Sequence, residues 1–423
     1  MSQLNLSQAY SSDIDNNKNY FLPLTAMTVL FFLWGFITVL NDLLIPRLKD
    51  VFSLSYTEAM FIQLCFFGAY FIVSLPAGTL VKKVGYKHGV IIGLVIASVG
   101  CALFYPAAMI KEYWIFLTAL FVLASGITIL QVSANPYVAA LGPDKTASSR
   151  LNLAQALNSL GTTLGPMVGS VLFFGGTSAL VIEASSADSV KIPYLILAGA
   201  LMTIAVLFSL LKLPEIHANE NDDQVPLETA SLFQAKHLIY GVFAIFCYVG
   251  AEVSIGSFLI NFLGEKEIAG ISESKAAVFI SYYWGGAMVG RFIGAFIMRF
   301  VSPAKILLIN SICVVALLTL TMSSTGNTAM FSVLAIGLFN SIMFPTIFTL
   351  AISGLGKQTS QASGWLCLAI VGGALVPLLQ GLLADIFHLQ VSFIVPALCY
   401  VFIIWYALNV TKYSSLWIKS IKD

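Results

Sequence analysis

Residues Phe31–Pro46 read FFLWGFITVLNDLLIP, an apolar run that contains a single carboxylate, Asp42. An apolar run of about twenty residues is long enough to cross a bilayer as a helix. A charged side chain at the bilayer centre costs roughly 3 kcal/mol on insertion scales, so an acid inside such a helix indicates a functional site. The alternative is an acid at the membrane surface, because only Leu43, Leu44 and Ile45 separate Asp42 from Pro46.

The composition extends this interpretation to the whole chain. Of 423 residues, 58% are hydrophobic and 10% are charged, and the mean hydropathy is +0.91. These values are typical of an integral membrane protein whose surface faces a lipid bilayer. A net charge of +1 provides no basic surface for nucleic acid.

Apolar segments of transmembrane length recur along the chain between charged, Gly and Pro residues. We predict twelve helices, an all-α membrane protein, with spans 21–45, 60–81, 90–108, 114–141, 151–174, 194–213, 237–263, 275–300, 306–325, 329–353, 361–387 and 391–417. The polar stretch 214–236 separates the sixth span from the seventh and is predicted to be a cytoplasmic linker. The predicted units are therefore an N-terminal tail (1–20), a six-helix bundle (21–213), the linker (214–236), a second six-helix bundle (237–417) and a C-terminal tail (418–423).

The distribution of positive charge predicts the orientation. Most of the 21 Lys and Arg residues fall in the termini and in the loops on the same side as the termini, and such residues accumulate in cytoplasmic loops. The first twenty residues also lack the charged start and apolar core of a cleaved signal peptide. Both termini are therefore predicted to be cytoplasmic.

The two halves contain matching spacings. Arg150, Gly161 and Pro166 have the same spacing as Gln361, Gly372 and Pro377, and Gln131 precedes Pro136 by five residues as Asn340 precedes Pro345. Two similar offsets on either side of a linker favour an internal duplication, as in transporters built from repeated bundles.

The fifth span carries a polar stripe that lipid would not tolerate. Its members recur three and four residues apart, so most lie on one helical face: Asn152, Gln155, Asn158, Ser159, Thr162 and Thr163. One explanation is hydrogen bonding between helices. The other, which we favour, is the wall of a cavity, since amides donate and accept hydrogen bonds and suit the hydroxyls of a sugar.

The seventh span contains a second acid, Glu252, deep within CYVGAEVSIGSFLINFL. The state of a buried carboxylate depends on its solvation and on nearby cations, so Asp42 and Glu252 are predicted to take part in coupling. The alternative for Glu252 is a structural acid that is hydrogen-bonded within the protein.

Two tryptophans lie well inside their spans rather than at the membrane surface. Trp34 and Trp365 are our candidates for stacking on the apolar face of a sugar ring. The alternative for both is packing.

Positive residues lie where the second and eighth spans leave the membrane. Lys82, Lys83, Arg291 and Arg299 are predicted gate residues, because a cation can bond the carbonyls at a helix end in one conformation and release them in another. The positive-inside rule is a sufficient alternative explanation.

Signatures of catalysis and metal binding are missing from the sequence. It contains no HExxH, P-loop or GxSxG motif, and its six cysteines are not paired as metal ligands. We therefore predict that the chain is not an enzyme and that it uses no cofactor or bound structural metal.

Five motifs resemble the major facilitator superfamily, and within it the fucose/galactose/glucose symporter family of bacteria. They are LNDLLIP with the preceding FLWGF (32–46), GAYFIVSLPAG (68–78), ASGITILQVSANPYVAALGP (124–143), SRLNLAQALNSLGTT (149–163) and YVGAEVSIGSFL (248–259). The resemblance covers nearly the whole chain. It implies two six-helix bundles in the bacterial inner membrane, a central sugar site, alternating access and energisation by a cation gradient.

The chain departs from the fucose permeases at one position. Their first-helix Asp corresponds to Asp42, but their fourth-helix acid is replaced by Gln131, which cannot titrate. The resemblance therefore favours glucose or galactose over L-fucose, and it assigns Glu252 to recognition or coupling. The predicted sugar-binding residues are Trp34, Asn41, Gln131, Asn135, Gln155, Asn158, Glu252, Asn340 and Trp365.

These observations predict a monomeric hexose:cation symporter, with Asp42 as the coupling acid and either H⁺ or Na⁺ as the coupling ion. A proton-coupled importer of L-fucose or another sugar is the alternative. A proton-driven exporter would favour an apolar cavity over the amide stripe. A sugar sensor would need a signalling domain, and a channel would need a continuous polar pore.

Overall fold

The computed structural model describes residues 20–42, 56–174, 191–211, 213–214 and 232–422, and these form helices and short connections. The described part of the first half contains five long helices: α1 (Phe21–Asp42), α3 (Tyr56–Ile110), α4 (Tyr113–Ala140), α5 (Ala147–Phe174) and α6 (Lys191–Leu210). A short 3₁₀ helix, η1 (Asp144–Thr146), precedes α5.

The second half has more helices because several of its spans are interrupted. The complete set is η3 (Leu232–Gln234), α7 (Lys236–Gly264), α8 (Glu273–Ile297), α9 (Pro303–Ser323), α10 (Gly326–Asn340), α11 (Met343–Ala351), η4 (Gly356–Gln358), α12 (Thr359–Leu368), η5 (Ala369–Val371), α13 (Gly372–Ile386), α14 (Leu389–Ser392) and α15 (Ile394–Lys422).

The described helices cover the twelve predicted spans, although their boundaries differ. The second and third spans form one long element, α3, whose helical geometry is broken at Gly85 (φ 81°, ψ 164°). A side chain disfavours this positive φ, so glycine provides the break between the two spans. The tenth span is divided between α10 and α11, and the eleventh among α12, η5 and α13.

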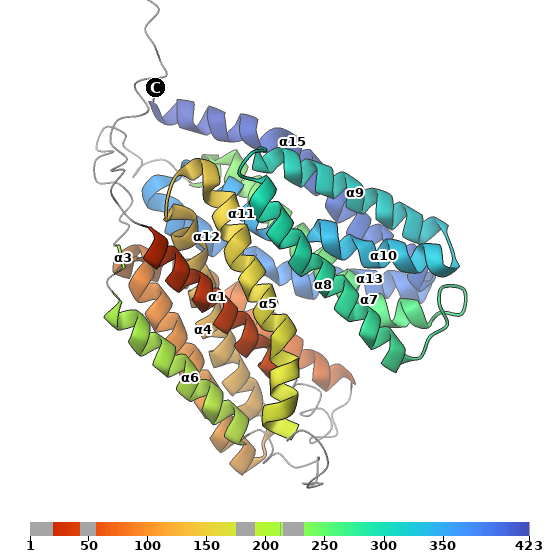
Figure 1. Ribbon diagram of the computed structural model, residues 1–423, viewed down its shortest axis with the longest axis horizontal. Coiled ribbons are helices and arrows are strands. Elements are labelled where there is room, and N and C mark those ends of the chain that lie inside the picture. Colours follow the sequence, from red (N-terminus) through yellow and green to blue (C-terminus); the bar gives the residue numbers. More distant parts are fainter. Residues whose placement is uncertain (1–19, 43–55, 175–190, 212, 215–231, 423) are drawn as a thin grey trace, which may run out of the picture.

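The helices form two groups that correspond to the two halves of the chain (Figure 1). In the first, α1 packs on α5, and α3 packs on α4 and α6. In the second, α7 packs on α13 and α15, and α9 and α10 lie between α8 and α15. Contacts between the groups run through α5 with α8 and α11, and through α12 with α3 and α4. We call these groups the first bundle and the second bundle. Their boundaries in the sequence are the predicted ones, residues 21–213 and 237–417.

The predicted repeat is visible at two glycine contacts. A Cβ at Gly161 would lie 2.2 Å from the main-chain oxygen of Phe32, where α5 crosses α1. A Cβ at Gly372 would lie 2.2 Å from the main-chain oxygen of Phe246, where α13 crosses α7. Small residues let membrane helices approach closely. Gly161 and Gly372 therefore occupy matching places in the two bundles.

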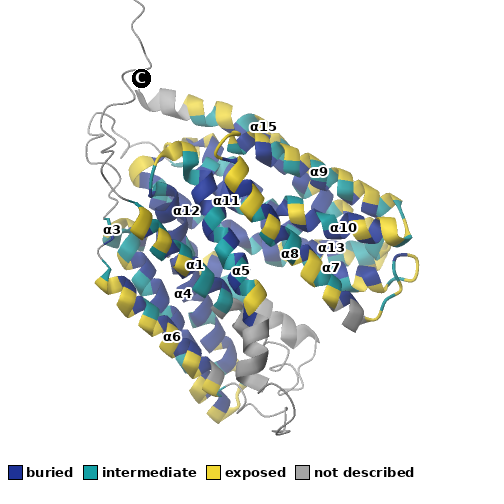
Figure 2. Cartoon of the chain, in the orientation of Figure 1, coloured by how far each residue is buried: buried dark blue, intermediate teal, exposed yellow. Residues whose placement is uncertain are grey.

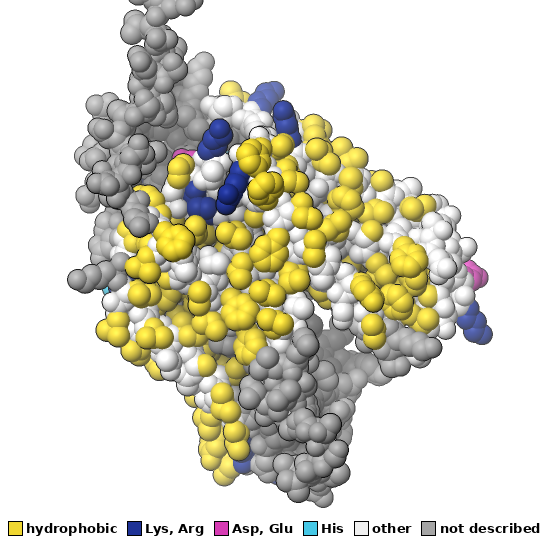
Figure 3. Space-filling model, viewed as in Figure 1, with side chains coloured by type: hydrophobic (Ala, Val, Ile, Leu, Met, Phe, Trp, Pro, Cys, Tyr) yellow, Lys and Arg dark blue, Asp and Glu magenta, His cyan; other side chains and the backbone are white. Residues whose placement is uncertain are grey.

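The exterior is largely apolar, whereas buried residues face the interior of the bundles (Figure 2). Large hydrophobic side chains such as Phe71, Leu207, Phe296 and Leu398 are more than half exposed. On the face in Figure 3, hydrophobic side chains spread across the helices and Lys and Arg gather near the end that carries the C-terminus. Seven helices in the described part of the chain are long and apolar enough to span a membrane. This surface is suited to lipid.

Candidate functional site

An open cavity lies between the two bundles. The first bundle contributes α1, α4 and α5 to its wall, and the second contributes α7, α8, α11 and η5. The lining residues are Trp34, Gln131, Gln155, Asn158, Val249, Glu252, Arg291, Phe344 and Ile370. The cavity therefore brings together five of the predicted sugar-binding residues.

Three uncharged amides line the side formed by the first bundle. Gln131 Nε2 donates to the Tyr70 hydroxyl at 2.7 Å, and Asn158 Nδ2 donates to the main-chain oxygen of Phe31 at 2.9 Å. Gln155 Nε2 is 3.5 Å from Asn135 Oδ1. In these three bonds the amide nitrogens are the donors, and no bond to the side-chain oxygens is present among the described residues. Amide oxygens can accept from the hydroxyls of a ligand.

Two charged side chains of opposite sign line the side formed by the second bundle. Glu252 Oε1 accepts a hydrogen bond from the Tyr248 hydroxyl at 2.7 Å, one helical turn away on α7. Arg291 on α8 interacts electrostatically with Glu252. Charges at membrane depth are costly unless they have polar partners or face a polar cavity. Both side chains line the cavity, Glu252 is hydrogen-bonded to Tyr248, and Arg291 is hydrogen-bonded to main-chain oxygens.

In the polar stripe of α5, some residues line the cavity and others form hydrogen bonds within or between helices. Gln155 and Asn158 line the cavity. Asn152 instead bonds across the bundles, with Nδ2 3.3 Å from Met298 Sδ and 3.3 Å from Thr346 Oγ1. Thr162 and Thr163 donate to the main-chain oxygen of Ser159. Cavity wall and interhelical bonding are both present, at different turns of one helix.

Three predicted sugar-binding residues lie outside the cavity lining. Asn135 is buried directly behind Gln155. Asn340 lies inside the second bundle, where it donates to the Tyr283 hydroxyl at 3.0 Å and accepts from the Tyr400 hydroxyl at 2.5 Å. Trp365 packs edge-on against Phe233, with ring centroids 4.7 Å apart. For Trp365 the structure therefore favours the packing alternative.

Gln131 and Asn340, which match in the repeat, lie in different surroundings. Gln131 lies within α4 and lines the cavity. Asn340 is the last residue of α10, and its amide bonds to Tyr283 and Tyr400 inside the second bundle.

The predicted gate residues separate into two groups. Lys82, Lys83 and Arg299 are exposed, as the positive-inside alternative requires. Arg291 does not lie in a loop; it lines the cavity and bonds to both bundles. The remaining predicted residues, Asn41 and Asp42, are the last two of α1, and their side chains lie outside the described part of the structure.

Three lining residues, Val249, Phe344 and Ile370, were missing from the predicted site. Apolar residues in apolar helices carry no local signal. The repeat does not supply one either, because the residues that match Ile370 and Phe344 in the first half, Ser159 and Asn135, do not line the cavity.

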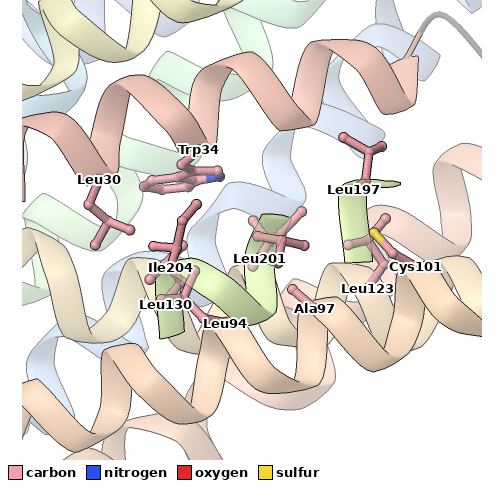
Figure 4. A pocket seen from close by; sticks show the side chains of 11 residues that line it. Leu30, Trp34, Leu94, Ala97, Cys101, Leu123, Leu130, Leu197, Leu201 and Ile204 are labelled. Atoms are coloured by element: carbon pink, nitrogen blue, oxygen red, sulfur yellow. The ribbon is translucent and has the colours of Figure 1, made fainter. Parts of the chain in front are cut away.

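A second cavity lies within the first bundle and is almost wholly apolar (Figure 4). Leu94, Ala97, Leu130, Leu201 and Ile204 are among its lining residues, and the Trp34 indole forms one wall. Its lining is almost entirely carbon, so it is poorly suited to a hydroxylated ligand. Trp34 thus separates an apolar interior from the polar cavity.

Hydrogen bonds join the two bundles near the beginning of α5. We call this region of contact the inter-bundle interface. The Ser148 and Thr349 hydroxyls are 2.5 Å apart, and Ser149 Oγ donates to the main-chain oxygen of Ala295 at 2.5 Å. At a separate contact, Ser363 Oγ donates to the main-chain oxygen of Val132 at 2.9 Å. Pro136 has no N–H, so the Val132 carbonyl is available to this donor.

A family model of the Major Facilitator Superfamily matches residues 24–369. The chain belongs to the Major Facilitator Superfamily. It is thus a multi-pass membrane transporter, and the predicted fold class is confirmed.

Similar members of the superfamily match over nearly their full length. The chain is 56% identical over 401 residues to the glucose/galactose transporter of Brucella abortus, covering 95% of this chain and 97% of the relative. It is 48% identical to the putative glucose/galactose transporter of Helicobacter pylori, covering 92% and 96%. The L-fucose-proton symporter of Escherichia coli is 33% identical, with 95% of each chain covered.

The fold is also similar to solved structures of this superfamily. The crystal structure of FucP in the outward conformation has a TM-score of 0.85 and 32% identity, covering 93% of this chain and 99% of FucP. The proton:xylose symporter XylE, at 14% identity and a TM-score of 0.74, shares the fold.

Proposed function

We propose that this chain is a secondary active transporter that imports glucose or galactose by cation-coupled symport. The observation that carries the proposal is the cavity in which amides from one bundle face Glu252 and Arg291 from the other. The glucose/galactose transporters among its relatives support the substrate class.

The cavity has the groups that a hexose requires. Gln131, Gln155 and Asn158 provide amides whose oxygens accept hydrogen bonds from hydroxyls, and Glu252 is a stronger, charged acceptor. Trp34 is only 8% exposed, so the edge it presents to the cavity is held by the surrounding packing. An aromatic surface beside amides suits a sugar, whose ring has an apolar face and a polar rim.

Transport follows from the position of the cavity between two bundles. Rocking of the bundles about the cavity alternates access to the sugar between the two sides of the membrane. Net accumulation requires that a cation change the relative stability of the two states. We propose Asp42 as the acid that binds this cation, either H⁺ or Na⁺, and Glu252 as a sugar-facing group that also responds to it.

We further propose that the protein is a monomer in the bacterial inner membrane with both termini in the cytoplasm. The bias of Lys and Arg toward the loops on the side of the termini supports this orientation.

The decisive experiment is uptake of labelled glucose, galactose and L-fucose into proteoliposomes under a proton gradient or a sodium gradient applied separately. We expect glucose or galactose to accumulate under one of the two gradients. Accumulation of L-fucose alone would show that L-fucose, and not glucose or galactose, is the substrate. Absence of hexose uptake under both gradients would overturn the proposal.

A further inference from the structure

Arg291 bonds to acceptors in both bundles. Its Nη1 donates to the Ser159 hydroxyl and to the main-chain oxygen of Gln155 at 3.4 Å, both on α5. Its Nε donates to the main-chain oxygen of Ser341 at 3.0 Å, beside α8 in the second bundle. One guanidinium therefore connects the bundles at the wall of the cavity.

The contact within the second bundle is fixed by the local backbone. In a continuous helix the Ser341 carbonyl would accept from residue 345, but Pro345 has no N–H. Gly290 brings α8 close enough to use this carbonyl, since a Cβ there would lie 2.3 Å from the main-chain oxygen of Leu338. Separation of the bundles would break the bonds to α5 and leave the bond to Ser341 intact.

Glu252 offers Arg291 a replacement partner. Glu252 on α7 and Arg291 on α8 belong to the same bundle, line the same cavity and interact electrostatically. They move together if the bundles move as rigid bodies. The α5 acceptors are uncharged and move with the other bundle. A guanidinium that lost them would be left unpaired at membrane depth unless Glu252 took their place.

We propose that Arg291 exchanges partners during the transport cycle, binding α5 when the inter-bundle interface is closed and Glu252 when it opens. Neutralising Glu252, through a cation or through hydrogen bonds to the sugar, removes the competing partner and favours the closed interface. This inference rests on the proposed transport function, and it makes Arg291 the positioning residue that links cavity occupancy to closure.

The closed interface can be measured without transport. Cysteines replacing Ser148 and Thr349, whose hydroxyls are 2.5 Å apart, form a disulfide only while the interface is closed. A protease site inserted in the 215–231 segment allows cross-linked halves to be counted on a non-reducing gel. In this paired-cysteine background, we expect Arg291→Gln to slow cross-linking about tenfold and Ser159→Ala about threefold, since hydrogen bonds to charged groups are strong.

Matched variants control for general disturbance. Thr162→Ala removes a hydroxyl one turn from Ser159 whose bond among the described residues is to the main-chain oxygen of Ser159 on the same helix. Lys412→Gln removes an exposed cation on α15. Both are expected to cross-link at the unmodified rate. Arg291→Lys keeps the charge without the planar fork and is expected to restore part of the rate lost in Arg291→Gln.

The exchange itself is tested by combining substitutions. Glu252→Gln should restore closure when added to Ser159→Ala, because the competing partner is gone, and should have no effect when added to Arg291→Gln. A further loss of cross-linking in Ser159→Ala/Glu252→Gln, or an equal effect of Glu252→Gln with and without Arg291, would overturn the proposal. Cross-linking is independent of uptake, so normal partner exchange with no hexose transport would instead refute the proposed substrate.

Discussion

The two bundles contribute different chemistry to one cavity. The first supplies Gln131, Gln155 and Asn158, which are uncharged, together with the Trp34 ring. The second supplies both charges of the lining, Glu252 and Arg291, set among apolar Val249, Phe344 and Ile370. Amides recognise hydroxyls with little dependence on their surroundings, whereas buried charges respond strongly to cations and to movement. From this asymmetry we infer that the first side recognises the sugar without changing its charge, whereas the second side both contacts the sugar and changes state.

The largest effect should come from Asp42→Asn, because Asp42 is the candidate charge of the first half. We expect gradient-driven accumulation to be lost while exchange of labelled for unlabelled sugar continues. Measurement of both activities in the same proteoliposomes separates coupling from recognition. If the Asp42→Asn variant accumulates sugar as well as the unmodified protein does, Asp42 is not the coupling acid. The response to the cation would then lie in the second bundle alone.

Glu252→Gln should weaken sugar binding by about 10–100-fold, the range expected when a hydrogen bond to a charged group is removed. Equilibrium binding of the labelled hexose measures this change. Lys412→Gln, on the exposed side of α15, is the control. Unchanged affinity would show that the charged side of the cavity does not contact the sugar.

Asn158→Ala should reduce sugar affinity about tenfold, as expected for loss of one or two neutral hydrogen bonds. The exchange rate at saturating sugar should change less, because the amide side is proposed to hold the substrate rather than to respond to cations. Thr162→Ala, one turn along the same helix, is the matched control. A selective loss of accumulation with unchanged affinity would contradict the division between the two sides.

Gln131→Glu places an acid on the amide side and makes the cavity more alike on its two sides. The Tyr70 hydroxyl, which now accepts from Gln131 Nε2 at 2.7 Å, would have to act as the donor to the new carboxylate. We expect uptake to fall severalfold at neutral pH and to recover toward acidic pH, where protonation restores a neutral side chain. A pH profile identical to that of the unmodified protein would show that this position is not sensitive to charge.

Trp34→Phe should weaken sugar binding only about threefold, since a smaller aromatic surface remains. Trp365→Phe should leave affinity unchanged, because Trp365 packs on Phe233 and does not line the cavity. Competition binding with both variants side by side tests the choice between the two tryptophans. Equal losses in both would place Trp365 at the site.

The sequence predicted the residues whose types are unusual in lipid. Gln131, Gln155, Asn158 and Glu252 stand out in apolar helices because each is costly there without a partner, and all four line the cavity. The same reasoning cannot tell a cavity from a buried hydrogen bond, since either removes the cost. Asn340, enclosed by Tyr283 and Tyr400, carries the same sequence signal as Gln131.

The sequence by itself determined the membrane fold, the twelve spans and the polar side chains available to a site, because transfer of apolar and polar groups into lipid is decided residue by residue. Only the tertiary structure decided which polar groups meet. Asn340 bonds to Tyr283 and Tyr400 inside the second bundle, whereas Arg291, predicted as a gate residue, lines the cavity wall. Helix packing and backbone breaks depend on contacts between segments far apart in the chain, which local composition does not record.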